Sequence, residues 1–531
     1  MHEPLGLTAG FRWHATHRPD APAMVWHGRE TSYGELSAMA GRAMAGLEEL
    51  ELGEGEPVGL LAAKSPAAVA LVLACLLGRR PFLLPSPALA GETLTELFAA
   101  AGCAHVLSPD AESGFTRAAD AAMSPGPVSP GTATPGTVAP GTVPADVCFM
   151  LTTSGSTGLP KIVPLPRDAV DRFVAWAGPA FGIGPGRNVL NYAPLNFDLC
   201  LLDVWTTLAH GGCVVLVDPE RAADGRRLAD LLAAHPVHVF QAVPMCFGLL
   251  PENAVFGEVE HVMFTGDAIP ERTLERLPGL FPKARLYNIY GCTETNDSFV
   301  HELDGIGSPV PLGEPLPGVS VLVVDQDGGL VDGPGAGELY VSTPFQTRGY
   351  LGRAGRFGPH PRGLDDRVYF RSGDLVRRDP DGRIFLVGRA DFQVKVRGVA
   401  VNTAEIEQAL LEHPSVLEAA VVAEPDAVAG RRLVCVVRRA PASGLNSLRL
   451  REHCARRLPK AAIPAVTRII DEPLPKTSTG KVDRNAAGRL YQSFERLPGD
   501  GTTRLPGDGT TPLPGDGADH LPGDGTEGRA S

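Results

Sequence analysis

The chain has 531 residues, 44% of them hydrophobic and 21% charged, which is the composition of a globular protein large enough for about two to four domains. Its formal net charge of −13 at pH 7 provides no overall positive field for nucleic acid or an anionic membrane surface, so neither is predicted as a partner. No apolar run approaches the roughly 18 residues of a membrane span, and the N-terminus lacks the charged-then-apolar order of a secretory signal, so we expect a cytoplasmic location.

The first 120 residues predict alternating helices and short strands. Residues 32–50 are helix-like, whereas the apolar runs at 57–64 and 81–85 are typical of strands. Such alternation favours an α/β fold. Residues 124–144 interrupt it with repeated Pro-Gly-Thr and no apolar period, which predicts a flexible surface insertion.

The segment from residue 146 to about 385 predicts a longer series of strands. Several of its apolar runs end directly in Gly, Asp, Asn or Thr, as strands do where they deliver polar residues to a site. The runs lie at 147–154, 213–218, 237–244, 261–267, 284–291, 319–325 and 337–342.

A second, smaller unit is predicted after the large domain of residues 1–390. Helix-like stretches at 403–414 and 448–458 flank strand-like runs at 416–424 and 431–439, which predicts an α+β domain over residues 391–492. Residues 493–531 are dominated by repeats of LPGDG with one apolar residue in each unit. That is too little to offset the entropy of ordering, so a disordered tail is predicted.

The segment 151–161 reads LTTSGSTGLPK and has the chemistry of an anion-binding loop. Its two glycines allow backbone N–H groups to converge on one point, and its hydroxyl groups add donors. Lys161 adds a positive charge. In the Walker P-loop, Lys and Ser/Thr directly follow the last glycine, which is not the spacing here. The segment therefore predicts a phosphate-binding loop of another type.

This loop resembles the phosphate loop of the acyl-adenylate-forming superfamily, which includes acyl-CoA synthetases, luciferases and the amino-acid adenylation domains of nonribosomal peptide synthetases. Further segments resemble family motifs in the same order: NIYGCTET at 288–295, YFRSGDL at 369–375, GRADFQVKVRG at 388–398 and LPKTSTGKVDR at 474–484. The resemblance covers about residues 10–490. It implies a large domain of stacked α/β layers with a β-rich subdomain, and a small mobile α+β lid domain.

The resemblance also implies that ATP and Mg²⁺ are bound. Glu294 would bind the magnesium ion, since a hard carboxylate suits it. Tyr290 would stack on the adenine, and Asp374 would accept both ribose hydroxyls. Asn288, Gly291 and Arg389 would complete the adenosine site, and the phosphates would contact Thr152, Thr153, Ser154, Gly155, Ser156, Thr157, Gly158 and Lys161.

The chemical steps are assigned through the same resemblance. Lys481 would touch both the attacking carboxylate and the α-phosphate, where negative charge accumulates, and Thr293 would contact the α-phosphate. Asp391 resembles the hinge about which the lid rotates between the two half-reactions. That rotation would move Lys481 out and bring the strand that begins at Lys395 in.

Phe197 and Asp198 resemble the F-D-x-S motif of amino-acid adenylation domains, in which the aspartate pairs with the substrate's α-ammonium group. Leu199 and Leu202 resemble the pockets of stand-alone prolyl-carrier ligases, but Asp297 departs from that pattern. An acid at this position could meet a side-chain amine or a β-amino group, or it could point away from the pocket. The transferred pocket positions are Leu199, Leu202, Gln241, Met263, Thr265, Ile289, Asp297 and Ser298.

The main functional prediction is a free-standing ligase of specialised metabolism, such as antibiotic biosynthesis. It would adenylate an amino acid, release pyrophosphate and pass the aminoacyl group to the phosphopantetheine thiol of a separate carrier protein, because no carrier motif follows Arg484. One alternative is an acyl-CoA ligase for a non-amino carboxylic acid. The segment LPKTSTGK at 474–481 resembles the motif of that branch more closely than the usual motif of peptide synthetases. Another is a catalytically idle nucleotide-binding protein, against which Glu294, Asp374 and Lys481 together argue.

Overall fold

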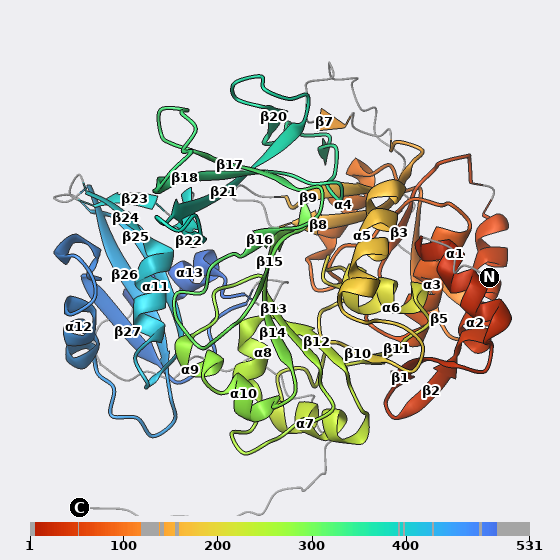
Figure 1. The fold of residues 1–531 in the computed structure, drawn as a ribbon, viewed down its shortest axis with the longest axis horizontal. Helices are drawn as coiled ribbons and strands as arrows, with labels where there is room; N and C mark the ends of the chain where they lie inside the picture. Colours follow the sequence, from red (N-terminus) through yellow and green to blue (C-terminus); the bar gives the residue numbers. More distant parts are fainter. Residues whose placement is uncertain are drawn as a thin grey trace, which may run out of the picture.

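The structure is a computed structural model that describes residues 6–50, 52–117, 137–138, 143–153, 159–390, 393–396, 399–426, 430–476 and 481–495. Figure 1 shows the N-terminal elements at one side of the molecule, the C-terminal elements at the other, and strands β12 to β15 between them. The helices are α1 Leu7–His17, α2 Tyr33–Glu48, α3 Pro66–Leu77, α4 Gly91–Ala100, α5 Arg167–Ala180, α6 Thr207–Ala209, α7 Gly225–Ala234, α8 Pro244–Leu249, α9 Glu271–Leu274, α10 Leu277–Leu280, α11 Thr403–Leu411, α12 Ser447–Ala455 and α13 Arg484–Glu495, with the π-helix η1 Leu201–Thr206 and the 3₁₀ helix η3 Lys460–Ala462.

The first sheet has the strand order β6-β5-β3-β4-β8-β9. Its antiparallel pair β8–β9 places Thr153 opposite Lys161, so both ends of the predicted phosphate loop meet at one point of the sheet. Helix α3 is buried along Ala68 to Leu76 and apolar on all sides, as a helix enclosed by other elements must be. The strands are β3 Val58–Leu60, β4 Phe82–Leu83, β5 His105–Asp110, β6 Gly114–Arg117, β8 Val147–Thr153 and β9 Lys161–Pro166.

The second sheet has the order β16-β15-β14-β13-β12-β10-β11-β1-β2, and its central strands run parallel. Side chains alternate between two apolar cores: Met263 and Ile289 join the core shared with α3 and the first sheet, whereas Phe240 and Phe264 join a core on the opposite face. The strands are β1 Pro22–Trp26, β2 Arg29–Ser32, β10 Asn188–Asn191, β11 Cys213–Leu216, β12 Val239–Ala242, β13 His261–Thr265, β14 Arg285–Cys292, β15 Asn296–Glu302 and β16 Glu314–Pro315.

A third, antiparallel sheet follows with the order β17-β18-β21-β20 and β22 paired to β21. Within the predicted flexible insertion at 124–144, Thr137 and Val138 form strand β7 and pair with β19. Both are β-branched residues, and β19 offers them backbone partners. The rest of the insertion is described only from residue 143 onward. The strands are β17 Ser320–Val324, β18 Gly335–Ser342, β19 Tyr350–Leu351, β20 Phe357–Pro359, β21 Val368–Arg378 and β22 Ile384–Arg389.

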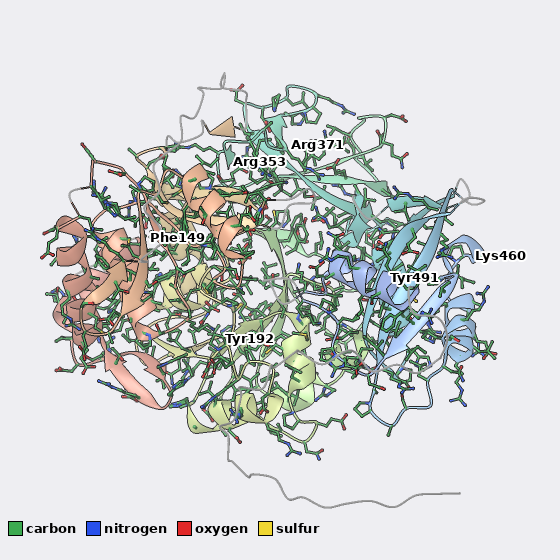
Figure 2. The ribbon with its side chains drawn as sticks, turned by 180° about the vertical axis from the view of Figure 1, so that it is seen from behind. Phe149, Tyr192, Arg353, Arg371, Lys460 and Tyr491 are labelled. Carbon is green, nitrogen blue, oxygen red and sulfur yellow. The ribbon has the colours of Figure 1, made fainter. Side chains whose placement is uncertain are left out.

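The C-terminal part contains a two-stranded and a three-stranded sheet among its described residues. Helix α13 lies against the three-stranded sheet, and Tyr491 is buried there in one apolar cluster with Ala420 and Val434 (Figure 2). The strands are β23 Gln393–Val396, β24 Val399–Asn402, β25 Val416–Asp426, β26 Gly430–Arg439 and β27 Val466–Ile470. The predicted domain boundary lies between residues 390 and 391. Residue 390 is described, and Asp391 lies outside the described residues.

The predicted mixed α/β class is confirmed, and each quoted helix-like or strand-like run overlaps an element of the expected type. The predicted repeat tail lies outside the described residues from residue 496 onward. Across the part of the chain that the structure describes, no helix combines the length and apolar character needed to cross a membrane.

Candidate active site

The central feature of the site is the edge of the second sheet where parallel strands end together. Register places Gln241 beside both Asn191 and Met263, and Thr265 beside Ile289. Because the carboxyl ends of parallel strands meet at one edge of a sheet, loops that follow them can combine residues from distant segments. The predicted substrate positions on β12, β13 and β14 therefore share one wall.

Asp198 lies in the loop between β10 and the π-helix η1. Its side chain is half-buried, and the Thr293 hydroxyl hydrogen-bonds to it. Burial raises the pKa of Asp198, while the Thr293 hydrogen bond and the positive charge of Lys481 act in the opposite direction. A π-helix is a rare element that often occurs at functional sites, and here it begins three residues after the predicted ammonium-binding residue.

The apolar part of the wall contains Leu202, Met263 and Ile289, which are each at most 1% exposed. All three belong to the same apolar core, and Leu199 packs against it. Ser298 behaves differently from these residues: its hydroxyl group donates to Thr295 Oγ1 and to the Asn296 carbonyl, both at 3.2 Å. Its side chain therefore stabilises the turn between β14 and β15.

Two of the predicted substrate positions are buried polar residues. Gln241 is 1% exposed, and its Oε1 has no hydrogen-bond partner among the described residues. Asp297 is 9% exposed. Burial and the nearby Asp198 carboxylate raise the pKa of Asp297 to about 8. The two acids are thus close enough to repel each other electrostatically.

The opposite face of β14 carries the predicted adenosine residues. Tyr290 donates from its hydroxyl to Asp374 Oδ2 at 2.5 Å, and Arg389 donates to Asp374 Oδ1 at 2.8 Å. Each carboxylate oxygen retains a lone pair for a ribose hydroxyl, so Asp374 fits its predicted role. Asn288 donates to the Pro311 carbonyl at 2.8 Å, which fixes the strand beside Gly291.

Glu294 is 8% exposed and accepts a hydrogen bond from the Tyr350 hydroxyl through Oε1. The ammonium group of Lys161 lies 4.7 Å from the centre of the Tyr350 ring, which connects the phosphate loop to the glutamate. No cluster of three or more His, Cys, Asp or Glu residues that could hold a metal occurs among the described residues. One carboxylate with an oxygen to spare fits Mg²⁺, which commonly takes one or two protein ligands and the phosphates of a substrate.

Lys481 reaches this site from the C-terminal part of the chain. Its ammonium group donates to the Gly266 carbonyl, which follows β13. Burial raises the pKa of both Asp198 and Asp374, and the positive charge of Lys481 partly opposes this effect at each of them.

Several predicted residues lie outside what the structure describes. They are Ser154, Gly155, Ser156, Thr157 and Gly158 of the phosphate loop, and the hinge residue Asp391. Lys395 belongs to β23, but its side chain is not described. Thr152 and Thr153 are half-buried at the end of β8, next to the start of the loop.

A buried charge network that was not predicted from the sequence lies next to the Asp198 loop. Lys64 is 6% exposed and donates to the carbonyls of Asn191 and Tyr192, at 3.1 and 3.0 Å. Asp203 is fully buried and accepts from the Asn191 amide at 3.0 Å. Burial lowers the pKa of Lys64 and raises that of Asp203. The negative charge of Asp203 partly offsets the first shift, and the positive charge of Lys64 partly offsets the second. The sequence signal that could have indicated this network is one charged residue, Lys64 or Asp203, within each of two otherwise apolar runs.

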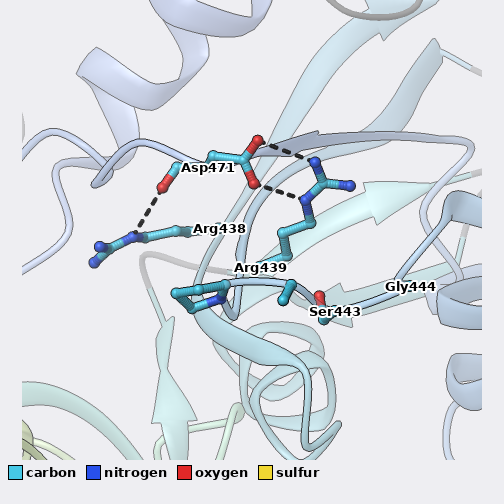
Figure 3. A pocket seen from close by; sticks show the side chains of 7 residues that line it. Arg438, Arg439, Ser443, Gly444 and Asp471 are labelled. Atoms are coloured by element: carbon cyan, nitrogen blue, oxygen red, sulfur yellow. Dashed lines mark hydrogen bonds and ion pairs between the residues drawn. The ribbon is translucent and has the colours of Figure 1, made fainter.

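A pocket of about 530 Å³ lies elsewhere, in the C-terminal part (Figure 3). Asp471 accepts two hydrogen bonds from Arg439, at 2.7 and 3.0 Å, and its carbonyl accepts one from Arg438 at 3.3 Å. No predicted site residue lines this pocket; Arg439 forms an ion pair with Asp471, and Arg438 forms one with Glu418 outside the pocket lining.

Comparison with known protein families identifies the family of this chain. Residues 11–351 match the profile of the AMP-binding enzyme family, and residues 405–481 match that of the AMP-binding enzyme C-terminal domain. The chain belongs to the AMP-binding enzyme family. The predicted membership of the acyl-adenylate-forming superfamily is thereby confirmed.

Relatives within this family include amino acid–carrier protein ligases. The chain is 36% identical over 358 residues to an L-proline–[L-prolyl-carrier protein] ligase of Streptomyces coelicolor, covering 65% of this chain and 66% of that protein. It is 33% identical to the ligase of that name from Pseudomonas fluorescens, covering 66% and 70% of the two chains. A dimodular nonribosomal peptide synthase of Bacillus subtilis is 30% identical over 90% of this chain and 21% of its own length. These relatives agree with the main functional prediction.

Solved structures of adenylate-forming enzymes share the fold of this AMP-binding enzyme. ATP-bound MatB of Rhodopseudomonas palustris superposes with a TM-score of 0.75 at 23% identity, over 92% of this chain and all of that one. A four-domain nonribosomal peptide synthetase bound to AMP and glycine gives the same TM-score at 23% identity, over 90% of this chain and 36% of that one. The predicted fold, with a large N-terminal and a smaller C-terminal part, is confirmed.

Replacement of Lys64 tests the buried network. We expect Lys64→Met to lower the free energy of unfolding by about 3 kcal/mol or more, because it leaves the Asp203 carboxylate buried without its cation. Lys64→Met combined with Asp203→Asn should recover part of this loss, since asparagine keeps an acceptor for Asn191. Urea denaturation of the wild type, both single variants and the double variant measures the coupling. Additive losses would contradict the interaction.

Asp297 should make the stability depend on pH. Its pKa is about 8 in the folded protein and near 3.8 in the unfolded chain, so between these values the folded protein holds a proton that the unfolded chain has released. The free energy of unfolding therefore falls as the pH rises from about 5 to about 8, by at most about 1.4 kcal/mol per pH unit from this group. Asp297→Asn should show a smaller fall than the wild type in urea denaturation, whereas the exposed control Asp304→Asn should match the wild type. Equal falls in all three proteins would contradict the assignment.

Proposed function

We propose that this chain is an amino acid–carrier protein ligase. It forms an aminoacyl-AMP from an amino acid and ATP, releases pyrophosphate, and transfers the aminoacyl group to the phosphopantetheine thiol of a separate carrier protein. The observation that carries this proposal is Asp198, a half-buried carboxylate at the apolar wall and within the field of Lys481. A buried α-ammonium group needs such a partner, whereas an aryl or fatty acid does not.

In the first step, a carboxylate oxygen of the amino acid attacks the α-phosphorus of ATP. The new carboxylate–phosphorus bond forms as the bond between the α-phosphorus and the bridging oxygen breaks, and pyrophosphate leaves with that oxygen. Lys481 stabilises the charge that develops on the α-phosphate oxygens and on the attacking carboxylate. Asp198 orients the substrate through its α-ammonium group, and Asp374 with Arg389 holds the ribose.

Magnesium, when bound, neutralises the charge of the departing pyrophosphate. Glu294 would hold it, and the Tyr350 hydroxyl keeps the Glu294 side chain in one orientation. Lys161, next to the Tyr350 ring, would contact the same phosphates from the loop. In the second step the carrier thiol attacks the adenylate carbonyl and AMP leaves. We propose that rotation about Asp391 withdraws Lys481 and brings the strand of Lys395 to the site.

ATP–pyrophosphate exchange over a panel of amino acids tests the first step. We expect exchange with at least one amino acid, and we expect Lys481→Ala to lower it by about 10²- to 10³-fold because one charge-stabilising donor is lost. Lys460→Ala is the matched control, since Lys460 is an exposed lysine on the outer side of the same C-terminal part (Figure 2). Exchange with aryl or fatty acids and with no amino acid would favour the acyl-CoA ligase instead. Unchanged exchange by Lys481→Ala would contradict its catalytic role.

A second experiment tests the magnesium assignment. Tyr350→Phe removes the hydroxyl that orients Glu294, and we expect it to raise the half-saturating Mg²⁺ concentration of the exchange reaction by about 10-fold. Tyr340→Phe, a change of the same type on β18, should leave it unaltered. If both variants required the same Mg²⁺ concentration as the wild type, the orienting role of Tyr350 would be excluded.

A further inference from the structure

The segment that carries Lys481 is held together by backbone contacts at its base. Lys476 and Val482 form an isolated antiparallel bridge, so two stretches of the segment lie side by side. Next to this bridge, the Asp483 N–H donates to the Pro475 carbonyl at 2.8 Å. Lys481 is the residue directly before Val482. Its position therefore depends on how this base is attached to the C-terminal part.

One side of the base is attached to Glu418 of β25. Glu418 Oε2 accepts a hydrogen bond from the Leu474 N–H at 2.8 Å, and its Oε1 forms an ion pair with Lys476 at 2.7 Å. Leu474 is buried in the apolar cluster beneath. A single carboxylate thus uses both of its oxygens on one short stretch of chain, which restrains a main-chain group and a side chain together.

The other side of the base is attached to Glu407 of α11. Glu407 Oε1 accepts from Arg484 Nε at 2.7 Å, and Oε2 pairs with Arg484 Nη2. Glu407 Oε1 also accepts the Val421 N–H of β25 at 2.8 Å, and the Glu407 side chain is buried. A buried bidentate pair of this kind has a well-defined geometry. Arg484, three residues after Lys481, is therefore fixed in position.

Both acids belong to the C-terminal part, where α11 and α13 each contact β25 (Figure 1). From this part Lys481 extends to the Gly266 carbonyl at the end of β13. A lysine has a flexible four-carbon stem, so its main chain must be fixed to keep its ammonium group at one point. We propose that Glu407 and Glu418 are positioning residues of the adenylation step, which hold the segment so that Lys481 reaches the α-phosphate. This inference rests on the proposed function, because it assumes that Lys481 acts there.

ATP–pyrophosphate exchange with Glu407→Gln and Glu418→Gln tests this inference on the full chain. Glutamine keeps the size of each side chain and removes the charge that holds the segment. We expect each variant to lower kcat by about 10-fold, because a displaced catalytic group loses its alignment with the reacting atoms. The KM values for ATP and for the amino acid should stay within about 2-fold of the wild type, since neither acid is placed in their sites.

Glu424→Gln is the matched control. Glu424 is a buried glutamate of the same strand, β25, but it pairs with Arg432 at 3.2 Å. Its variant should keep the wild-type kcat, and thermal unfolding checks that every variant is folded. Lys476→Met removes the ion pair with Glu418 without changing a buried residue. It should lower kcat in the same direction, which keeps the test decisive if a variant of a buried acid fails to fold.

A double-mutant cycle separates positioning from a general loss of stability. An acid that acts through Lys481 has no further effect once that ammonium group is gone. Adding Glu407→Gln or Glu418→Gln to Lys481→Ala should therefore lower the residual exchange by less than about 2-fold. A loss of folded protein would instead lower exchange by the same factor in both backgrounds. The residual exchange of Lys481→Ala is measured at a raised enzyme concentration.

The outcomes separate the two proposals. The full loss in the Lys481→Ala background, an equal loss in Glu424→Gln, or wild-type exchange by both Glu407→Gln and Glu418→Gln would overturn the positioning role and leave the ligase proposal intact. Wild-type exchange by Lys481→Ala would overturn the catalytic role of Lys481 and this inference with it. Exchange with non-amino acids alone would overturn the ligase proposal, and the same variants assayed with such an acid would still test the positioning role.

Discussion

The burial of three carboxylates in and beside the second sheet is the constraint on which the rest of the site depends. Asp198, Asp297 and Asp374 are all placed where burial raises the pKa of an acid. The cations that oppose this effect come from other elements: Arg389 from β22 and Lys481 from the C-terminal part. Electrostatic interactions therefore connect the predicted substrate residues, the predicted nucleotide residues and the C-terminal part of the molecule.

Lys481 also connects the C-terminal part of the chain to the end of β13. The nearby Arg484 pairs with the buried Glu407 of α11, donating from Nε at 2.7 Å, so the start of α13 is fixed within the C-terminal part. From that anchor Lys481 extends to the Gly266 carbonyl at the end of β13. A cation held by its own domain and attracted by acids of the other can stabilise their contact without a large apolar interface between them.

A second pair of buried charged residues lies next to the loop that carries Asp198. Lys64 and Asp203 are far apart in the sequence, yet both contact Asn191 at the end of β10. Such a pair contributes little net stability because desolvation offsets the attraction, but it strongly disfavours any arrangement in which one charge loses the other. It thus restricts the position of the loop that carries Asp198, the residue proposed to bind the substrate's ammonium group.

The sequence by itself determined the strands and helices, the order of the motifs and the family. These depend on local residue patterns, and the apolar runs and the segments around Glu294, Asp374 and Lys481 carry them directly. The roles of the site residues stay predictions. Only the tertiary structure decided that the Ser298 hydroxyl donates within the turn between β14 and β15, that Lys64 and Asp203 both contact Asn191, and that β7 pairs with β19. The reason is physical: burial, strand register and charge pairing are set by residues distant in the chain, and no local pattern encodes them.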